Sequence, residues 1–362
     1  MIENAQAPLA SKTQLRNNYY LASISFLIAA TGLIFTRILF GLGLFSNLPD
    51  AWFDFLGSVL IQIVFIFGGG LFVLLIQQKL YNQNRLGENY KPLKQRLSEM
   101  GFRLPRLYLI PLSIVLGILF FIMNIGVSYI NTLILFLLGY NFPPASPEAM
   151  GGIGLFLLAL FNSAVLPGFC EEFLNRGIVL RGLRSSMNEK TAILISALLF
   201  GLLHANIRQT LYTFVGGIIL ATLTIKTRSI LPAMIIHFMN NAISVYSSHA
   251  SYNGWPGANW ETFLQNHFLL SAMIWVICSV ALAGIVYWIV INEDEYYAQK
   301  AEKGEFLEPK TEIITSYETP FGVNLIKRTP LYQPGLQDKI MMYSAIFLLA
   351  LTTAFSLYLG MF

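Results

Sequence analysis

The chain has 362 residues, of which 55% are hydrophobic and only 12% are charged, and its mean hydropathy is +0.61. This composition excludes an ordinary soluble protein and predicts a polytopic helical membrane protein. The net charge of +4 comes without a basic stripe that contains interleaved aromatic residues, so we expect no nucleic-acid partner. The two cysteines form no disulfide framework and no CxxC metal motif.

Nine apolar runs in the chain predict membrane helices, since about 20 apolar residues cross the hydrocarbon core of a bilayer. The runs lie at residues 18–46, 53–80, 107–138, 150–185, 190–206, 209–226, 229–249, 266–292 and 340–361. The first is about 28 residues long, which is too long for the apolar part of a cleaved signal peptide. The predicted fold is therefore all-α, a transmembrane helical bundle of about 8–9 spans.

The basic residues orient these spans. If the spans alternate in direction, 20 of the 23 lysines and arginines fall on the side of the N-terminus. Because basic residues concentrate in cytoplasmic segments, we expect a cytoplasmic N-terminus and an external C-terminus. No organelle signal is visible, so the expected location is the cell membrane of a bacterium, with the chain in contact with the lipid bilayer.

The same pattern divides the chain into five parts. We expect about three transmembrane helices in residues 1–149, with a basic cytoplasmic loop at 81–106, and then a core that contains the polar residues at 150–250. An external loop with a further helix follows at 251–292, a cytoplasmic linker or appendage at 293–339, and a last helix at 340–362.

Three ionisable residues, Glu171, Glu172 and Arg176, lie inside one apolar run. Such groups are costly in lipid and mark functional sites by default. Glu172 and Arg176 are spaced i,i+4, so they share a helix face and can form an ion pair, whereas Glu171 points about 100° away from Glu172. We therefore assign the pair a structural role and Glu171 the proton chemistry of a general base or acid.

Two later runs add polar residues at a similar depth. Phe200 and His204 are one helical turn apart, and so are His237 and Asn241. Counted from the cytoplasmic helix ends at 1.5 Å per residue, Glu171 and His204 lie about 21 Å deep, and His237 and Asn241 about 12 and 18 Å. The agreement predicts one shared site that opens toward the cytoplasm. Taken singly, each residue also has a structural interpretation as a contact between helices.

Together the motifs Glu-Glu-x-x-x-Arg (171–176), Phe-x-x-x-His (200–204) and His-x-x-x-Asn (237–241) resemble those of a known family. It is the CAAX protease and bacteriocin-processing family of intramembrane endopeptidases, related to the type II prenyl-protein protease. The resemblance covers roughly 150–250 and makes this part the expected protease core.

The resemblance implies a role for each motif residue. Glu171 and His204 would activate a water for attack on a peptide carbonyl, and His237 and Asn241 would stabilise the oxyanion. The supporting members of the motifs are Glu172, Arg176 and Phe200.

The cofactor stays open between a glutamate-type and a metallo-endopeptidase. We favour a site without metal, because the chain has no His-Glu-x-x-His run. If zinc is present, Glu171, His204 and His237 would be its three protein ligands, with water in the fourth position.

The expected substrate is a membrane-embedded or lipid-modified protein or peptide, and no feature of the sequence indicates a prenyl group. Two alternatives use the same polar residues differently. One is a transporter in which buried Glu and His side chains relay protons. The other is a non-catalytic immunity or scaffold protein that keeps the motifs for stability.

Overall fold

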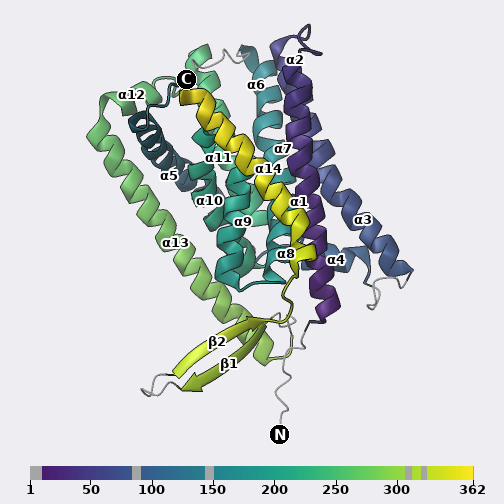
Figure 1. The fold of residues 1–362 in the computed structure, drawn as a ribbon. Coiled ribbons are helices and arrows are strands. Elements are labelled where there is room, and N and C mark those ends of the chain that lie inside the picture. The colour runs from purple at the N-terminus through teal and green to yellow at the C-terminus, as the bar shows by residue number, and fades with distance from the viewer. Residues whose placement is uncertain (1–9, 84–90, 143–150, 306–311, 319–323, 362) are drawn as a thin grey trace.

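The computed structural model describes residues 10–83, 91–142, 151–305, 312–318 and 324–361. They form a bundle of long helices with a two-stranded hairpin at one end (Figure 1). The long helices are α1 (Lys12–Gly41), the run α2–η1–α3 (Asp50–Asn82), α5 (Leu109–Leu137), the run α6–η2–α7–η3–α8 (Gly152–Arg184), α9 (Glu189–Leu203), α10 (Ile207–Thr227), α11 (Leu231–Asn253), α13 (Phe268–Glu302) and α14 (Leu336–Met361). Two short helices, α4 (Leu93–Glu99) and α12 (Trp260–Asn266), lie between them. The predicted all-α bundle is confirmed.

Each of the nine predicted spans corresponds to one of these long helices or runs. Seven of them are long and apolar enough to cross a membrane. The other two in the described part of the chain are α9, which has only 15 residues, and α11, which carries His237 and Asn241. The expected count of about 8–9 spans therefore depends on whether these two are included.

The segment 293–339 is more structured than a simple linker. Helix α13 continues to Glu302, and an antiparallel hairpin of β1 (Glu312–Glu318) and β2 (Asn324–Pro330) follows, with Glu318 opposite Asn324. The predicted boundary at 149/150 and part of the 81–106 loop lie outside the described residues. The division into five parts stays a prediction.

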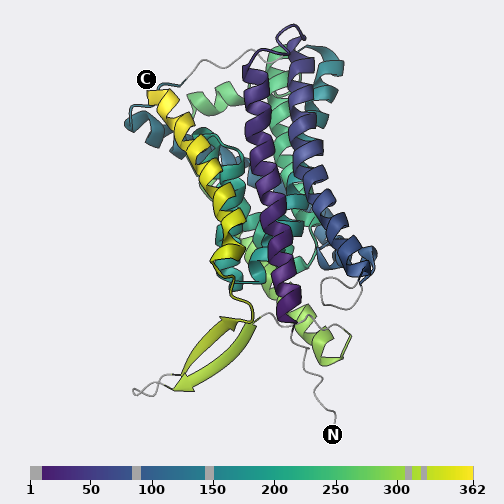
Figure 2. The same ribbon diagram turned by 45° about the vertical axis from the view of Figure 1, so that its right-hand side comes forward.

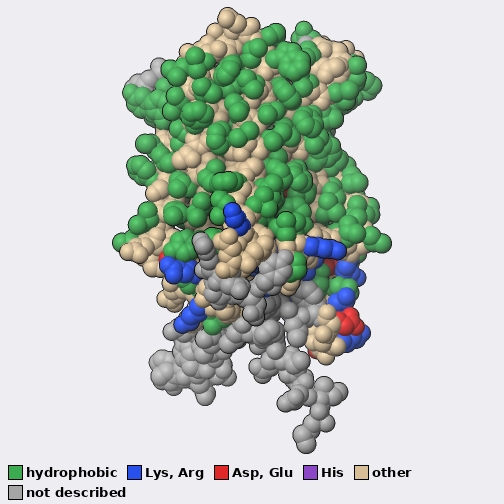
Figure 3. All heavy atoms as spheres, turned by 90° about the vertical axis from the view of Figure 1, so that its right-hand side faces the viewer, with side chains coloured by type: hydrophobic (Ala, Val, Ile, Leu, Met, Phe, Trp, Pro, Cys, Tyr) green, Lys and Arg blue, Asp and Glu red, His purple; other side chains and the backbone are tan. Residues whose placement is uncertain are grey.

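The two ends of the bundle differ in charge. We call the end where α1 begins the basal end and the end where α14 finishes the distal end; they lie at the bottom and top of Figure 1. Figures 1 and 2 both place the hairpin beyond the basal end. Figure 3 shows hydrophobic side chains over most of one face, with the visible charged side chains gathered toward the basal end. The chain is a multi-pass membrane protein, and a cytoplasmic basal end stays a prediction.

Two groups of buried apolar side chains hold the bundle together. The first surrounds the run Gly152–Arg184 with α1, α9 and α14, and includes Phe26 and Leu174. The second packs α11 against α5, α10 and α13, and includes Leu116 and Ile236. The polar residues singled out in the sequence lie on helices that these two groups fix.

Two of the runs depart from regular α-helix. The first contains α2 (Asp50–Ser58), the π-helix η1 (Val59–Gly68) and α3 (Gly69–Asn82). The second contains α6 (Gly152–Leu160), η2 (Phe161–Val165), α7 (Leu166–Glu172), η3 (Phe173–Val179) and α8 (Leu180–Arg184). Single π turns are rare and occur often at functional sites. Here two π segments flank α7, the helix that ends with the two glutamates.

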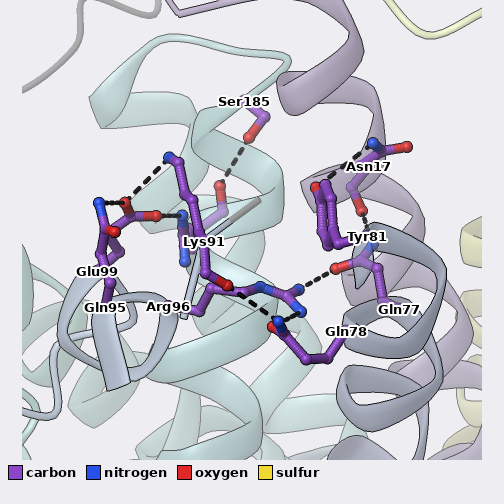
Figure 4. Close-up of polar contacts among 10 residues, drawn as sticks. Asn17, Gln77, Gln78, Tyr81, Lys91, Gln95, Arg96, Glu99 and Ser185 are labelled. Carbon is purple, nitrogen blue, oxygen red and sulfur yellow. Dashed lines mark hydrogen bonds and ion pairs between the residues drawn. The ribbon is translucent and has the colours of Figure 1, made fainter. Parts of the chain in front are cut away.

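At the basal end, a polar network fastens the short helix α4 to the bundle (Figure 4). Arg96 is buried and donates to the side-chain oxygens of Gln77 and Gln78 on α3, at 3.0 Å for Gln78. A buried guanidinium needs such partners, because removing it from water without hydrogen bonds is costly.

Glu99 at the end of α4 extends this network to α8. Its carboxylate accepts from Arg181 at 2.7 Å and from Lys91 at 3.0 Å. Burial alone would raise the pKa of Glu99, but the charges of Arg181 and Lys91 outweigh it and hold the pKa below its usual value. The basal end of the run that carries the glutamates is thereby anchored.

A close approach of α8 to α1 depends on Gly182. A Cβ atom at this position would lie 2.3 Å from Ala22 Cβ and 2.8 Å from the Asn18 carbonyl oxygen. We expect Gly182→Leu to lower stability by about 1–3 kcal/mol or to prevent folding, because overpacking forces helices apart. The thermal midpoint of the detergent-solubilised protein, followed by gel filtration, measures this. Gly284→Leu is the control, since nothing lies within 4 Å of a Cβ there; equal losses in both variants would contradict the prediction.

Candidate active site

A cavity of about 860 Å³ brings the predicted residues together. Glu171 from α7, His204 after α9, and His237 and Asn241 from α11 all line it, and so does Phe200. These side chains come from three segments of the chain that only the packing of the bundle makes neighbours. The expectation of one shared location is met, and their catalytic roles stay predictions.

Glu172 is the charged centre behind the cavity wall. Its carboxylate lies 3.1 Å from Arg176 Nε, and both side chains are completely buried. The other oxygen accepts from Nδ1 of His237 at 2.9 Å. The predicted i,i+4 pair is therefore present, and it also binds the neighbouring helix. With Nδ1–H donating to a carboxylate, Nε2 is the ring atom of His237 left for chemistry in the cavity.

His204 is held in a similar way by the backbone. Its Nδ1 donates to the Phe200 carbonyl oxygen at 3.0 Å, so Nε2 is again the available nitrogen. The Phe200 ring meets both histidine rings edge-on, at 5.1 Å from His204 and 5.7 Å from His237. The Arg176 guanidinium lies 4.3 Å from the same ring. Phe200 thus separates the buried ion pair from the cavity.

Glu171 points away from that ion pair, as its helical position predicts. It is 7% exposed, and its Oε1 accepts from Gln62 Nε2 at 2.6 Å. Among the described residues, no hydrogen-bond donor contacts its Oε2. Gln62 belongs to η1 and was missed in the sequence, although a glutamine within an apolar run is itself an unusual residue in lipid.

Asn241 is positioned by a hydrogen bond to an irregular turn of the run Gly152–Arg184. Proline has no backbone N–H, so Pro167 cannot donate to the carbonyl of Ser163 one turn earlier. Asn241 Nδ2 donates to that carbonyl at 2.9 Å. Its own oxygen accepts from Asn240, which in turn accepts from Asn124 at 2.8 Å. The remaining N–H of Asn241 is the one that can serve the cavity.

Arg37 is a second residue whose partners the sequence did not reveal. It lies on α1, and its guanidinium donates to the carbonyl oxygens of Ala205 at 2.8 Å and His204 at 2.9 Å. Ala205 has φ 45°, a conformation that non-glycine residues seldom adopt. A cation at the carbonyl end of a helix is favourable, so Arg37 stabilises the end of α9 where His204 lies.

The cavity extends toward the distal end of the bundle. Its lining includes Ala51 and Asp54 from the start of α2, Leu155 from the start of α6 and His249 from the last part of α11. Figure 1 places the start of α2 and of α6 at the distal end. The lining reaches the end opposite the basic segments, so a cytoplasmic N-terminus and an opening toward the cytoplasm, both expected from the sequence, do not fit together.

The candidate metal ligands do not form a close cluster in the described part of the chain. Among the described residues, no group of three or more His, Cys, Asp or Glu side chains is gathered closely enough to hold a metal ion. The alternative ligand set Glu171, His204 and His237 thus lines the cavity without converging on one point. Metal dependence stays a question for experiment.

Comparison with known proteins finds a family model that is similar to this part of the chain. Residues 153–243 match the family described as type II CAAX prenyl endopeptidase Rce1-like. The match covers about a quarter of the chain and includes all three motifs. It confirms the resemblance noted in the sequence. No curated protein and no solved structure matches the chain.

The buried ion pair gives a stability prediction. Glu172→Gln should destabilise the protein by about 3–5 kcal/mol, because it leaves the charge of Arg176 buried without a counter-ion. Combining it with Arg176→Met should restore part of the lost stability, since the effects of substitutions at two residues in direct contact are not additive. Glu171→Gln, the matched change next to it, should shift the thermal midpoint little. Additive losses in the double variant would show that the two side chains do not form a functional pair.

Proposed function

We propose that the protein is an intramembrane endopeptidase that hydrolyses a peptide bond with a water activated by Glu171 and His204. The family of residues 153–243 implies a protease acting on a protein substrate in the membrane. The observation that carries the residue assignment is that Glu171, His204, His237 and Asn241 line one cavity. The acid–base groups needed for hydrolysis are thus available around a shared space.

The first step is activation of water. Glu171 accepts a proton from a water in the cavity while the water oxygen attacks the peptide carbonyl carbon. Gln62 donates to Oε1 of Glu171, which leaves Oε2 as the proton acceptor. His204 holds the same water through Nε2, because its Nδ1 is committed to the Phe200 carbonyl. Because a neighbouring amide already holds the carboxylate in place, little reorganisation energy is needed at the moment of attack.

The carbonyl oxygen then becomes an oxyanion that His237 and Asn241 stabilise. Asn241 donates the N–H that Ser163 does not use. His237 donates from Nε2 when its ring is protonated, and Glu172 is the counter-ion of that charge. Hydrogen-bond donors that are held in place where water is scarce stabilise the transition state most strongly.

Collapse of the tetrahedral intermediate completes hydrolysis. The carbon–nitrogen bond breaks, and the proton taken up by Glu171 passes to the leaving nitrogen. The products are a new carboxyl group and a new amine, and Glu171 returns to its ionised form. No other residue has to change its charge over the cycle.

A zinc-dependent version would use Glu171, His204 and His237 as ligands, and the metal would lower the pKa of its bound water. The described residues do not gather as such a ligand set, so no step above uses a metal. The transporter alternative is less well supported, because no lining residue of the cavity comes from the basal ends of the helices, as a through pathway would need.

Cleavage of a membrane-tethered peptide by the full-length protein in liposomes tests the proposal. We expect Glu171→Gln and His204→Ala to lower kcat/KM by about 10²–10⁴, and His237→Ala and Asn241→Ala by about 10²–10³. Glu295→Gln and His267→Ala are the controls, since both residues are exposed and neither lines the cavity. Normal cleavage by the Glu171 variant would overturn the mechanism.

Two measurements on the full-length protein decide whether the activity depends on a metal. Activity after treatment with a strong chelator is compared with the metal content of the purified protein. Full activity at less than one-tenth equivalent of metal supports the metal-free mechanism. Loss of activity that zinc restores, together with one bound zinc, would replace it.

The orientation of the site gives a further prediction. With a cytoplasmic basal end, the cavity faces the outside of the cell. In a background with Cys170→Ala and Cys278→Ala, an impermeant maleimide should label Asp54→Cys in intact spheroplasts. It should label Glu302→Cys, at the end of α13, only after the membrane is permeabilised. The reverse pattern would show that the N-terminus is external.

A further inference from the structure

A second and much smaller pocket lies at the basal end of the bundle, and we call it the basal pocket. Its volume is about 50 Å³, and its lining comes from the end of α4 and the turn after it, from η3 and α8, and from the end of α10. Among the described residues of this lining, Glu99 is the one acid. Five arginines line the same pocket: Arg103, Arg176, Arg181, Arg184 and Arg228.

Two of these arginines share their carboxylates with lysines. Glu99 divides its carboxylate between Arg181 and a lysine, as described above (Figure 4). Glu189 lies 3.0 Å from Lys226 but 3.9 Å from Arg184. The carbonyl ends of α8 and α10 contribute roughly half a negative charge each, so they account for only part of the positive charge gathered here. A carboxylate that serves two cations leaves positive charge for a further anion.

Arg176 is the completely buried member of the lining. Its Nε lies 3.1 Å from Glu172, but among the described residues no hydrogen-bond acceptor contacts its two terminal nitrogens. Buried polar groups are nearly always hydrogen-bonded, so N–H groups of this kind mark a place where a ligand or a water binds. An oxyanion in the basal pocket brings acceptors next to this arginine.

Arg228 occupies a backbone position at which an arginine is unusual. It ends α10 with φ 54°, a left-handed conformation that glycine or asparagine usually adopts at the end of a helix. Its guanidinium lies 3.9 Å from the Tyr297 ring of α13, and its carbonyl oxygen accepts from Nε of Arg103 at 2.5 Å. These contacts position two of the lining arginines. A planar guanidinium that is already held in place loses little freedom when it binds an oxyanion.

We propose that the basal pocket binds the phosphate group of an anionic phospholipid from the surrounding leaflet. The arginine fork matches the geometry of phosphate oxygens, and basic pockets between membrane helices are typical sites for acidic headgroups. A volume of about 50 Å³ holds a phosphate-sized group, whereas pockets for cofactors and drug-sized ligands measure about 300–1,000 Å³. The pocket lies where the membrane-spanning run Gly152–Arg184 ends, which is the depth expected of lipid headgroups.

A lipid bound there joins segments that are distant in the chain. It holds together the basal end of α10 and the basal end of the run that carries Glu171 and Glu172. Because it binds the folded protein and not the separated segments, it stabilises the fold by mass action. Lipid binding is independent of the proposed hydrolysis and is measured without a peptide substrate.

Native mass spectrometry of the full-length protein in a neutral detergent tests this proposal. The protein is titrated with phosphatidylglycerol, phosphatidylcholine or inorganic phosphate in separate experiments, and its thermal midpoint is measured in each. We expect one phosphatidylglycerol to bind about tenfold more tightly than phosphatidylcholine and to raise the thermal midpoint. Raising NaCl to about 0.5 M should weaken this binding, because salt screens the charges. Inorganic phosphate at the same concentration should leave the midpoint unchanged.

Substitutions in the lining locate the bound lipid. Arg184→Gln and Arg103→Gln should each lower the affinity for phosphatidylglycerol about fivefold, as expected for one basic residue beside an acidic headgroup. Arg184→Lys should lose less affinity, because lysine keeps the charge but not the fork. The Arg184 side chain is 32% exposed, so its replacement should leave the fold intact. Lys190→Gln is the matched control, since Lys190 is exposed at the start of α9 and does not line the pocket.

Three results would overturn the proposal. Equal affinities for the two lipids would show that the pocket does not select a negative charge. Equal losses in the Lys190 and Arg184 variants would show that the lipid is attracted by the basic surface and not bound in the pocket. Stabilisation by inorganic phosphate equal to that by phosphatidylglycerol would exclude the lipid as the source of the phosphate group.

Discussion

The site depends on one completely buried carboxylate. Glu172 balances the charge of Arg176 on its own run and orients His237 on α11, so a single group joins two helices and fixes one ring nitrogen. A buried charge left unpaired is far more costly than an exposed one. The packing that places the ion pair out of water is therefore the same packing that places His237 at the cavity. A substitution at Glu172 therefore changes both the stability of the protein and the geometry of the site.

Irregular helix is the second constraint. The π segments η2 and η3 flank the short helix α7, and Pro167 leaves the Ser163 carbonyl without the donor that a regular helix provides. Asn241 fills that place from a different helix. The defect in one helix thus becomes the contact that positions a polar side chain of another. With a residue other than proline at position 167, a regular α-helix would supply the N–H that Asn241 donates here.

The helices and the members of the site could be predicted from sequence for different reasons. Apolar runs and the cost of charge in lipid are local properties, so they located the nine long helices and runs of the described residues and singled out Glu171, His204, His237 and Asn241. Gln62 and Arg37 were missed because their partners are distant in the chain and hydrogen bonds across the bundle leave no local pattern. Depth along a helix does not tell which end of a cavity the neighbouring side chains close, so the sequence did not reveal that the lining extends to the distal end.

The charge pattern of the whole chain bears on the chemistry of the cavity. Twenty of the 23 basic residues belong to segments expected at the basal end, where we expect them to orient the chain in the membrane. The cavity extends to the opposite end, so the residues that set topology are absent from its lining. The carboxylates of Asp54 and Glu171 line the cavity, whereas Arg176 pairs with Glu172 behind its wall. A basic residue added to the distal lining would weaken the charge asymmetry from which we expect the orientation of the helices.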